Sequence, residues 1–123
     1  MATDDQTTLS ELKKQIAYFR DERDWKQFHK PKDLAISVSV EAGELLELFQ
    51  WKTDSEINNT LDDPTKLSQL KDEVADIVVY CFNMSDIVGF DLADAIQRKL
   101  EQNAEKYPVD KAKGKATKYT ELE

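Results

Sequence analysis

Four acidic residues stand out because of their spacing. Glu41 and Glu44 form one pair, Glu73 and Asp76 form another, and the members of each pair are three residues apart. Residues three apart lie on the same face of an α-helix, so each pair would present two carboxylates together. Both pairs lie among apolar residues, where acids are usually avoided. If the two segments pack side by side, the four carboxylates converge.

Converging carboxylates raise one another's pKa, and a bound divalent cation removes this repulsion. Ligation by oxygen atoms alone suits Mg²⁺ or Mn²⁺ better than zinc. Neither pair contains the Glu-x-x-His motif of ferritin-like di-iron sites. The spacing is therefore compatible with a Mg²⁺ or Mn²⁺ site, without favouring it over the alternative. The alternative is a solvated acidic helix face, because Asp and Glu make up a fifth of the chain.

Three other residues bear on this site. Gly43 lies between the first two acids inside a predicted helix, where it costs about 1 kcal/mol relative to Ala, so we expect close approach by a neighbour or a ligand. The only histidine, His29, lies in a predicted break and is expected to be structural or solvated rather than a catalytic base. Cys81 is expected to be a core residue.

Apolar residues that recur every three or four positions predict helices that would position the acids. The four predicted segments are about 8–25, 33–51, 64–88 and 91–107. Asp63-Pro64 is a start signal for the third helix, and Gly89 is a stop signal. The apolar stripe of this helix includes Val74 and Val78, which we expect in the core. The predicted fold is an all-α four-helix bundle, and a bundle this small often completes its core by oligomerisation.

The remaining segments are polar. Residues 52–63 are interpreted as a loop, and residues 109–123 as a polar basic tail. No repeat or composition change divides the chain, so residues 1–123 are predicted to form a single domain.

Length, charge and cysteine content exclude several classes of protein. The chain has 123 residues and a formal net charge of −8. Such acidity disfavours extended nucleic acid and anionic membranes as partners. The N-terminus is unlike a signal peptide, and no apolar run approaches the ~20 residues that span a bilayer. With one cysteine the chain can form no internal disulfide, so we expect a cytoplasmic protein.

Longer stretches of sequence surround the acids. Glu41-x-x-Glu44 is followed, after 28 intervening residues, by Glu73-x-x-Asp76. The other stretches are Glu22-Arg23-Asp24-Trp25-x-Gln27-Phe28-His29-x-Pro31, Gly43-Glu44-Leu45-x-Glu47-Leu48-Phe49-Gln50-Trp51-Lys52, Asn103-x-x-x-Tyr107-Pro108 and Lys118-Tyr119-Thr120-Glu121-Leu122. Together they resemble the all-α nucleoside triphosphate pyrophosphatases of the MazG-like superfamily, and within it the dCTP pyrophosphatase group. The resemblance covers nearly the whole chain.

The resemblance implies an all-helical, Mg²⁺-dependent hydrolase that is oligomeric, commonly a tetramer, although a dimer is also compatible. Such enzymes convert a nucleoside triphosphate to the monophosphate and pyrophosphate. The implied metal ligands are Glu41, Glu44, Glu73 and Asp76, which would act in catalysis through a metal-activated water.

The same resemblance implies a base pocket formed by Trp25, Trp51 and Tyr80, since aromatic rings bind bases by stacking. The alternative is that these rings fill a core or an interface.

The resemblance also points to the segment before Pro108. Lys99, Asn103, Lys106 and Tyr107 are expected to meet the phosphates or the sugar. Lys106 could equally be an exposed lysine that interacts with the end of a helix.

We therefore expect a hydrolase that prefers dCTP or a modified dCTP. The first alternative is an enzyme of broader specificity or one that prefers dUTP. The second is a catalytically silent helical oligomerisation module, which would have no reason to keep four clustered acids.

Overall fold

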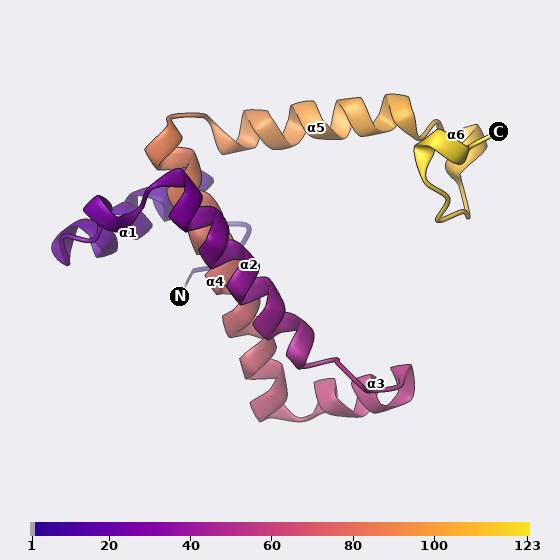
Figure 1. The fold of residues 1–123 in the computed structure, drawn as a ribbon, viewed down its shortest axis with the longest axis horizontal. Helices are drawn as coiled ribbons and strands as arrows, with labels where there is room; N and C mark the ends of the chain where they lie inside the picture. Colours follow the sequence, from indigo (N-terminus) through magenta and orange to yellow (C-terminus); the bar gives the residue numbers. More distant parts are fainter. Residues whose placement is uncertain (1) are drawn as a thin grey trace. The chain divides into compact units, whose positions relative to one another are not determined.

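The computed structural model describes residues 2–123, which contain helices and no strands. They form two compact units, one ending at Gly89 and the other running from Phe90 to Glu123. Figure 1 shows the first unit as a pair of neighbouring helices, α2 and α4, with α1 at one end and α3 at the other. The all-α class predicted from the sequence is confirmed.

Helix α1 spans Leu9–Glu22 and begins after Thr8, the first residue of the predicted segment. The Thr8 hydroxyl oxygen accepts a hydrogen bond from the Glu11 amide at 3.1 Å. The helix ends three residues before Trp25, because Asp24 adopts a left-handed backbone with φ of 53°. A single 3₁₀ turn, η1 (Lys26–Phe28), then leads to the next helix.

Helix α2 spans Pro31–Glu47 and starts two residues earlier than predicted. Pro31 occupies the first turn, where the missing N–H costs nothing, and Asp33, at the predicted start of the segment, lies inside that turn. The helix stops before the predicted end at Trp51. Trp51 itself is left-handed, with φ of 66°.

The prediction of a loop over residues 52–63 is wrong, because the segment contains helix α3 (Asp54–Asp62). The Thr53 hydroxyl caps it by accepting from the Glu56 amide at 3.2 Å. This Thr-x-x-Glu pattern is a capping box, and it is the sequence signal that identifies the helix. Ile57 and Leu61, four residues apart, are partly buried on one side of it.

Helix α4 spans Pro64–Val88, as predicted. Asp63 caps its start by accepting from the Thr65 amide at 3.0 Å, and Gly89 ends it with φ of 90°. Helices α1, α2 and α3 all pack against α4. Among the described residues, Leu34 on α2 and Phe82 on α4 are the buried apolar side chains. No helix within residues 2–123 has the length and apolarity needed to cross a membrane.

The second unit is built on helix α5 (Leu92–Lys106), which Asp91, the first residue of the predicted segment, caps. The polar segment after it includes a short helix, α6 (Val109–Ala112), and a 3₁₀ turn, η2 (Tyr119–Glu121). The Tyr119 ring packs edge-on against Tyr107 with centroids 5.9 Å apart. The Lys106 ammonium lies 4.8 Å from the centre of the Tyr119 ring. The basic segment thus makes specific contacts with the end of α5.

Several apolar side chains lie on uncovered helix faces. Val74 and Val78, which the sequence places in the core, are nearly half exposed on α4. Ile36 and Val40 are four residues apart on α2, and both are more than half exposed. Apolar stripes at this spacing normally face a packing partner. The chain therefore presents helix faces that are suited to contact with further protein.

Gly43 lies on the same outer face of α2 as Ile36 and Val40. The expectation that a neighbour approaches it closely is not met among the described residues, because a Cβ at this position would have nothing within 4 Å. We expect Gly43→Ala to raise the free energy of unfolding by about 0.5–1 kcal/mol through the better helix propensity of alanine. Urea unfolding measures this change.

The matched control is Gly89→Ala, which should destabilise the chain because φ there is 90°. If Gly43→Ala lowered stability or activity instead, a ligand or a second copy would have to occupy that side of α2.

Candidate metal centre and adjoining pocket

Three acids from two helices meet where α2 and α4 lie side by side. Glu41 comes from α2, and Glu73 and Asp76 come from α4. One carboxylate oxygen from each lies within 4.8 Å of the other two. Glu41 and Glu73 are partly buried, and Asp76 is exposed. The convergence predicted from the spacing of the two pairs is therefore present for these three residues.

The helix register explains why the acids meet. Glu41 follows Leu34 by seven residues, which is two helical turns, so it lies on the face of α2 that the buried Leu34 turns inward. On α4, Glu73 and Tyr80 are also seven residues apart and share a face. Packing of α2 on α4 therefore brings Glu41 to the pair Glu73 and Asp76.

Glu44, the fourth predicted ligand, lies outside this group of three. It is exposed one turn after Glu41 on α2. Its carboxylate is still close enough to act on Glu41 by a hydrogen bond and by its negative charge. The structure thus places Glu44 beside the cluster and not within it.

The negative charges of the three-acid cluster lie close together, and no cation balances them among the described residues. A hydrogen bond with Glu73 and partial desolvation, together with the nearby carboxylates of Glu44 and Asp76, raise the pKa of Glu41 to about 7. Glu41 Oε2 and Glu73 Oε2 are buried, and neither atom has a hydrogen-bond partner within residues 2–123. Buried acceptors normally have a partner. A divalent cation would satisfy both oxygens at once, so the donor set fits a metal that prefers oxygen ligands.

This pKa predicts a dependence of stability on pH and metal. The Glu41 carboxyl ionises near 4.5 when unfolded and near 7 when folded, so its stabilising contribution is fully present below 4.5 and lost as pH rises through 7. In EDTA, wild-type protein should therefore lose more stability over this interval than Glu41→Gln does. Adding Mg²⁺ should restore stability at the high end, because a cation favours the ionised carboxylates.

Urea unfolding of both proteins, with EDTA or with Mg²⁺, measures the difference. If the free energy of unfolding depended on pH in the same way for the wild type and Glu41→Gln in EDTA, the raised pKa of Glu41 would be contradicted. Equal stabilisation of both proteins by Mg²⁺ would contradict the assignment of Glu41 as a ligand.

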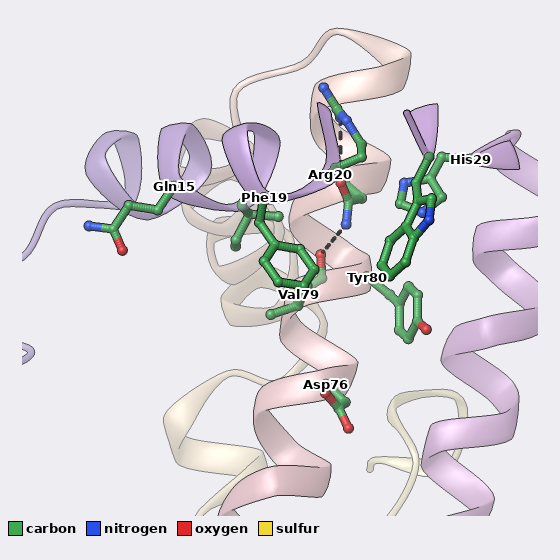
Figure 2. A pocket seen from close by; sticks show the side chains of 10 residues that line it. Gln15, Phe19, Arg20, His29, Asp76, Val79 and Tyr80 are labelled. Atoms are coloured by element: carbon green, nitrogen blue, oxygen red, sulfur yellow. Dashed lines mark hydrogen bonds between the residues drawn. The ribbon is translucent and has the colours of Figure 1, made fainter. Parts of the chain in front are cut away.

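A pocket of about 510 Å³ adjoins the acid cluster and shares Asp76 with it. Figure 2 shows Asp76, Val79 and Tyr80 projecting from α4, with Phe19 and Arg20 coming from α1. Its lining residues are Gln15, Ile16, Phe19, Arg20, Trp25, His29, Asp76, Val79, Tyr80 and Asn83. The pocket therefore joins aromatic walls to one edge of the acid cluster.

The predicted aromatic residues are divided between two places. Trp25 and Tyr80 both line the pocket. Trp51 does not, and its side chain is 93% exposed. The Trp25 ring packs edge-on against Phe19, with centroids 5.8 Å apart, and the Arg23 guanidinium covers the Phe19 ring at 3.7 Å. These contacts hold Trp25 in the pocket wall although it lies outside a regular helix.

The pocket also contains polar groups that the sequence interpretation did not assign to a site. Arg20 and Asn83 are each 3% exposed. The Arg20 Nη1 atom donates to Asp86 Oδ2 at 2.8 Å and to Asn83 Oδ1 at 3.4 Å. Its Nε atom donates to Asp21 Oδ1 at 2.9 Å, and this contact lowers the pKa of Asp21. The sequence does contain a signal that could have identified both residues: each is a polar residue within an apolar helical stripe.

His29 lines the same pocket and is partly buried, so it is not simply a solvated loop residue. Its Nδ1 atom is buried and has no hydrogen-bond partner among the residues that the structure describes. Burial and the positive charge of Arg20 lower the pKa of His29, which outweighs the opposing effect of Asn83. The imidazole is therefore neutral at neutral pH.

The residues predicted to contact phosphates or sugar belong to the second unit. Lys99, Asn103 and Lys106 lie on α5, and Tyr107 is the residue that follows it. The Tyr107 amide donates to the Asn103 carbonyl at 2.8 Å, and Tyr107 is the cap residue at the end of the helix. Contact of these four residues with a substrate stays a prediction.

The chain is similar to a known family and to several known proteins. The profile of the MazG-like family matches residues 36–122. The proteins named dCTP pyrophosphatase 1 from Mus musculus and Homo sapiens are each 38% identical over 115 residues, which cover 94% of this chain and 68% of theirs. The crystal structure of a pyrophosphatase from Archaeoglobus fulgidus is similar with a TM-score of 0.77 and 34% identity, covering 88% of this chain and 99% of that one.

Proposed function

The chain belongs to the MazG-like family, and we propose that it is a Mg²⁺-dependent enzyme that hydrolyses dCTP or a modified dCTP. It is a hydrolase of the nucleoside triphosphate pyrophosphatase class, and the metal and the base are the proposed parts. The observation that carries the proposal is the acid cluster, with oxygens within 4.8 Å, beside an aromatic pocket that shares Asp76.

The four acids would have different roles in binding the metal. Glu41, Glu73 and Asp76 would hold the cation, and Glu44 would join them after a change of side-chain rotamer. When bound, the cation would neutralise phosphate charge and polarise the attacking water. The products are the nucleoside monophosphate and pyrophosphate, formed by adding one water across a phosphoanhydride bond. No protein nucleophile is needed.

The aromatic walls would hold the base. Trp25 and Tyr80 line the pocket and offer ring faces for stacking, worth about 1–3 kcal/mol per base. Trp51 is too exposed to act in this pocket, so we propose that it serves a site completed by a second copy of the chain. Lys99, Asn103, Lys106 and Tyr107 are proposed to bind phosphate or sugar.

We further propose that the chain is a homo-oligomer, a tetramer or a dimer. Ile36, Val40, Val74 and Val78 leave apolar helix faces uncovered. Light scattering should give a mass two or four times the 14.2 kDa of one chain. Val78→Lys should lower this mass, because it places a charge on an apolar face, whereas Lys66→Glu near the start of α4 should not. A monomeric wild-type protein would contradict the proposal.

Partners and compartment follow from composition. A nucleotide accompanied by Mg²⁺ suits an acidic chain better than extended nucleic acid does, given a net charge of −8. The proposed compartment is the cytoplasm, because a single cysteine allows no internal disulfide.

Pyrophosphate release from a panel of triphosphates, with Mg²⁺ and with EDTA, tests the function. We expect release only with Mg²⁺ and the highest kcat/KM for dCTP or a modified dCTP. Similar rates on many triphosphates, or a preference for dUTP, would favour the broader alternative. No turnover of any triphosphate would favour a silent oligomerisation module.

A further inference from the structure

We propose that Arg20 and Asp86 are positioning residues that hold the Trp25 ring in the wall of the pocket. The inference rests on the proposed function, because it assumes that a nucleotide base binds beside Trp25. It deepens that function by naming the ion pair that prepares the pocket before the base arrives.

Trp25 lies outside a regular helix, and its neighbours in sequence tie it to α1. The left-handed backbone of Asp24, with φ of 53°, turns the chain after α1. The Trp25 amide then donates to the Arg20 carbonyl at 3.1 Å. The Trp25 ring packs on Phe19 of α1, with centroids 5.8 Å apart. The place of Trp25 in the pocket therefore depends on how α1 is attached to α4.

Arg20 makes this attachment. Of the residues that the structure describes in α1, it is the only one that is buried, with 3% exposure. Its Nη1 atom donates to two side chains of α4, to Asp86 Oδ2 at 2.8 Å and to Asn83 Oδ1 at 3.4 Å. A charged residue thus occupies the position where an apolar anchor is usual. The attachment of this end of α1 to α4 therefore depends on charge pairing.

The chain on the other side of Trp25 is attached to the same part of α4. His29 follows η1, and its imidazole hydrogen-bonds the Asn83 side chain. Asn83 and Asp86 are three residues apart, so they share a face of α4, and Tyr80 lies one turn before Asn83 on that face. Figure 2 shows His29 and Tyr80 in this pocket. Both ends of the segment that contains Trp25 are therefore fixed to the helix that carries the second aromatic ring.

A ring that is already in place binds a base more tightly than a mobile one. Ordering a mobile side chain and its loop on binding would consume part of the stacking energy. None of the three acids comes from α1, because Glu41 lies on α2 and Glu73 and Asp76 lie on α4. Loss of the ion pair should therefore weaken binding of the base and spare Mg²⁺ binding and the hydrolytic step.

The experiment compares wild type with Asp86→Asn, Asp86→Glu and the control Asp21→Asn. Asp86→Asn removes the charge that pairs with Arg20 across the two helices, whereas Asp86→Glu keeps it. The Asp86 side chain is 33% exposed, which leaves room for the extra methylene. Asp21→Asn removes the other carboxylate of the same guanidinium, which lies on α1 and does not connect the helices. Each variant leaves Arg20 a counter-charge, so all should fold, which circular dichroism checks.

Separate measurements follow Trp25, the base and the metal. Trp25 and Trp51 are the two tryptophans of the chain, so acrylamide quenching of fluorescence in a Trp51→Phe background reports the accessibility of Trp25. Calorimetry measures the binding of dCMP in EDTA and the binding of Mg²⁺ without nucleotide. Pyrophosphate release from dCTP with Mg²⁺ gives kcat and KM.

In Asp86→Asn we expect stronger quenching of Trp25, and about tenfold weaker dCMP binding and about tenfold higher KM, as for the loss of one stacking contact. We expect kcat to stay within about twofold of wild type, because the lost interaction is made equally with substrate and transition state. Mg²⁺ binding should not change. Asp86→Glu and Asp21→Asn should stay close to wild type. A merely destabilising change would not give this split, because the remaining folded protein would have the wild-type KM.

If Asp86→Asn unfolds, Arg20→Lys replaces it, with the same changes expected. Lysine keeps the positive charge but lacks the planar fork that reaches Asp86 and Asn83 together. Wild-type quenching and KM in whichever of these variants folds would overturn the inference. An effect in Asp86→Glu or Asp21→Asn as large as that in Asp86→Asn would also overturn it.

The quenching measurement separates this inference from the proposed function. If wild type hydrolysed no triphosphate but Asp86→Asn alone exposed Trp25 and weakened dCMP binding, the function would fail and the inference would stand. If wild type hydrolysed triphosphates while Asp86→Asn kept its Trp25 accessibility and its KM, the function would stand and the inference would fail.

Discussion

Glu73→Gln should lower the rate of Mg²⁺-dependent pyrophosphate release by at least about 100-fold, since even groups that only orient a metal ligand affect activity by 10- to 100-fold. Glu73 lies in the three-acid group, and its buried Oε2 has no hydrogen-bond partner in the described part of the chain. The amide keeps the shape of the side chain but removes a negative charge and one strong oxygen ligand. Steady-state rates over a range of Mg²⁺ concentrations measure the loss.

The stability of the same variant shows whether the loss is chemical. Removing one of several crowded carboxylates relieves repulsion, so Glu73→Gln should be at least as stable as wild type in EDTA. Asp72→Asn is the matched control, because Asp72 is an exposed acid next to Glu73 on α4 and outside the three-acid group. Full activity in Glu73→Gln, or an equal loss in Asp72→Asn, would contradict the assignment of the metal ligands.

Phe82→Ala should destabilise the chain by about 3–5 kcal/mol, the usual cost of truncating a buried phenylalanine. Phe82 is 3% exposed and, with Leu34, is one of the two buried apolar side chains among the described residues. So small a core has little capacity to absorb a cavity. Because α4 also carries Glu73 and Asp76, its loosening should weaken Mg²⁺ binding as well.

The control for this variant is Val88→Ala near the end of the same helix, where the side chain is 56% exposed. It should cost less than about 0.5 kcal/mol, as is usual for surface changes. Urea unfolding and Mg²⁺ titration of the two variants provide the comparison. Similar losses in both would mean that the core of this unit lies elsewhere, for instance against another copy of the chain.

Local sequence was sufficient for most of the helices, because their signals act within one turn. Asp63, Pro64 and Gly89 set the ends of α4 through a capping carboxylate, a fixed φ and a left-handed residue. The same reasoning would have found α3 if the capping box at Thr53 had been weighed above the polar composition around it. The end of α1 could not be placed, because it depends on the left-handed conformation of Asp24.

The acid pairs could be predicted for a similar reason. Spacing of three residues places Glu73 and Asp76 on one helix face whatever surrounds the helix. That Glu41 joins them, while Glu44 stays beside the cluster, depends on the register between α2 and α4. Register is a property of packing, and no short stretch of sequence specifies it.

The sequence of this chain thus determined its helices, its acid pairs and its family resemblance, since each arises from residues close together or from a matching pattern. Tertiary structure decided which residues share the pocket. Arg20 and Asn83 are 63 positions apart, and only the packing of α1 on α4 makes them partners. It also left Trp51 exposed while burying the Asn83 amide. Contacts of this kind depend on how whole helices pack, because a polar side chain on one helix is buried and paired by side chains of another helix.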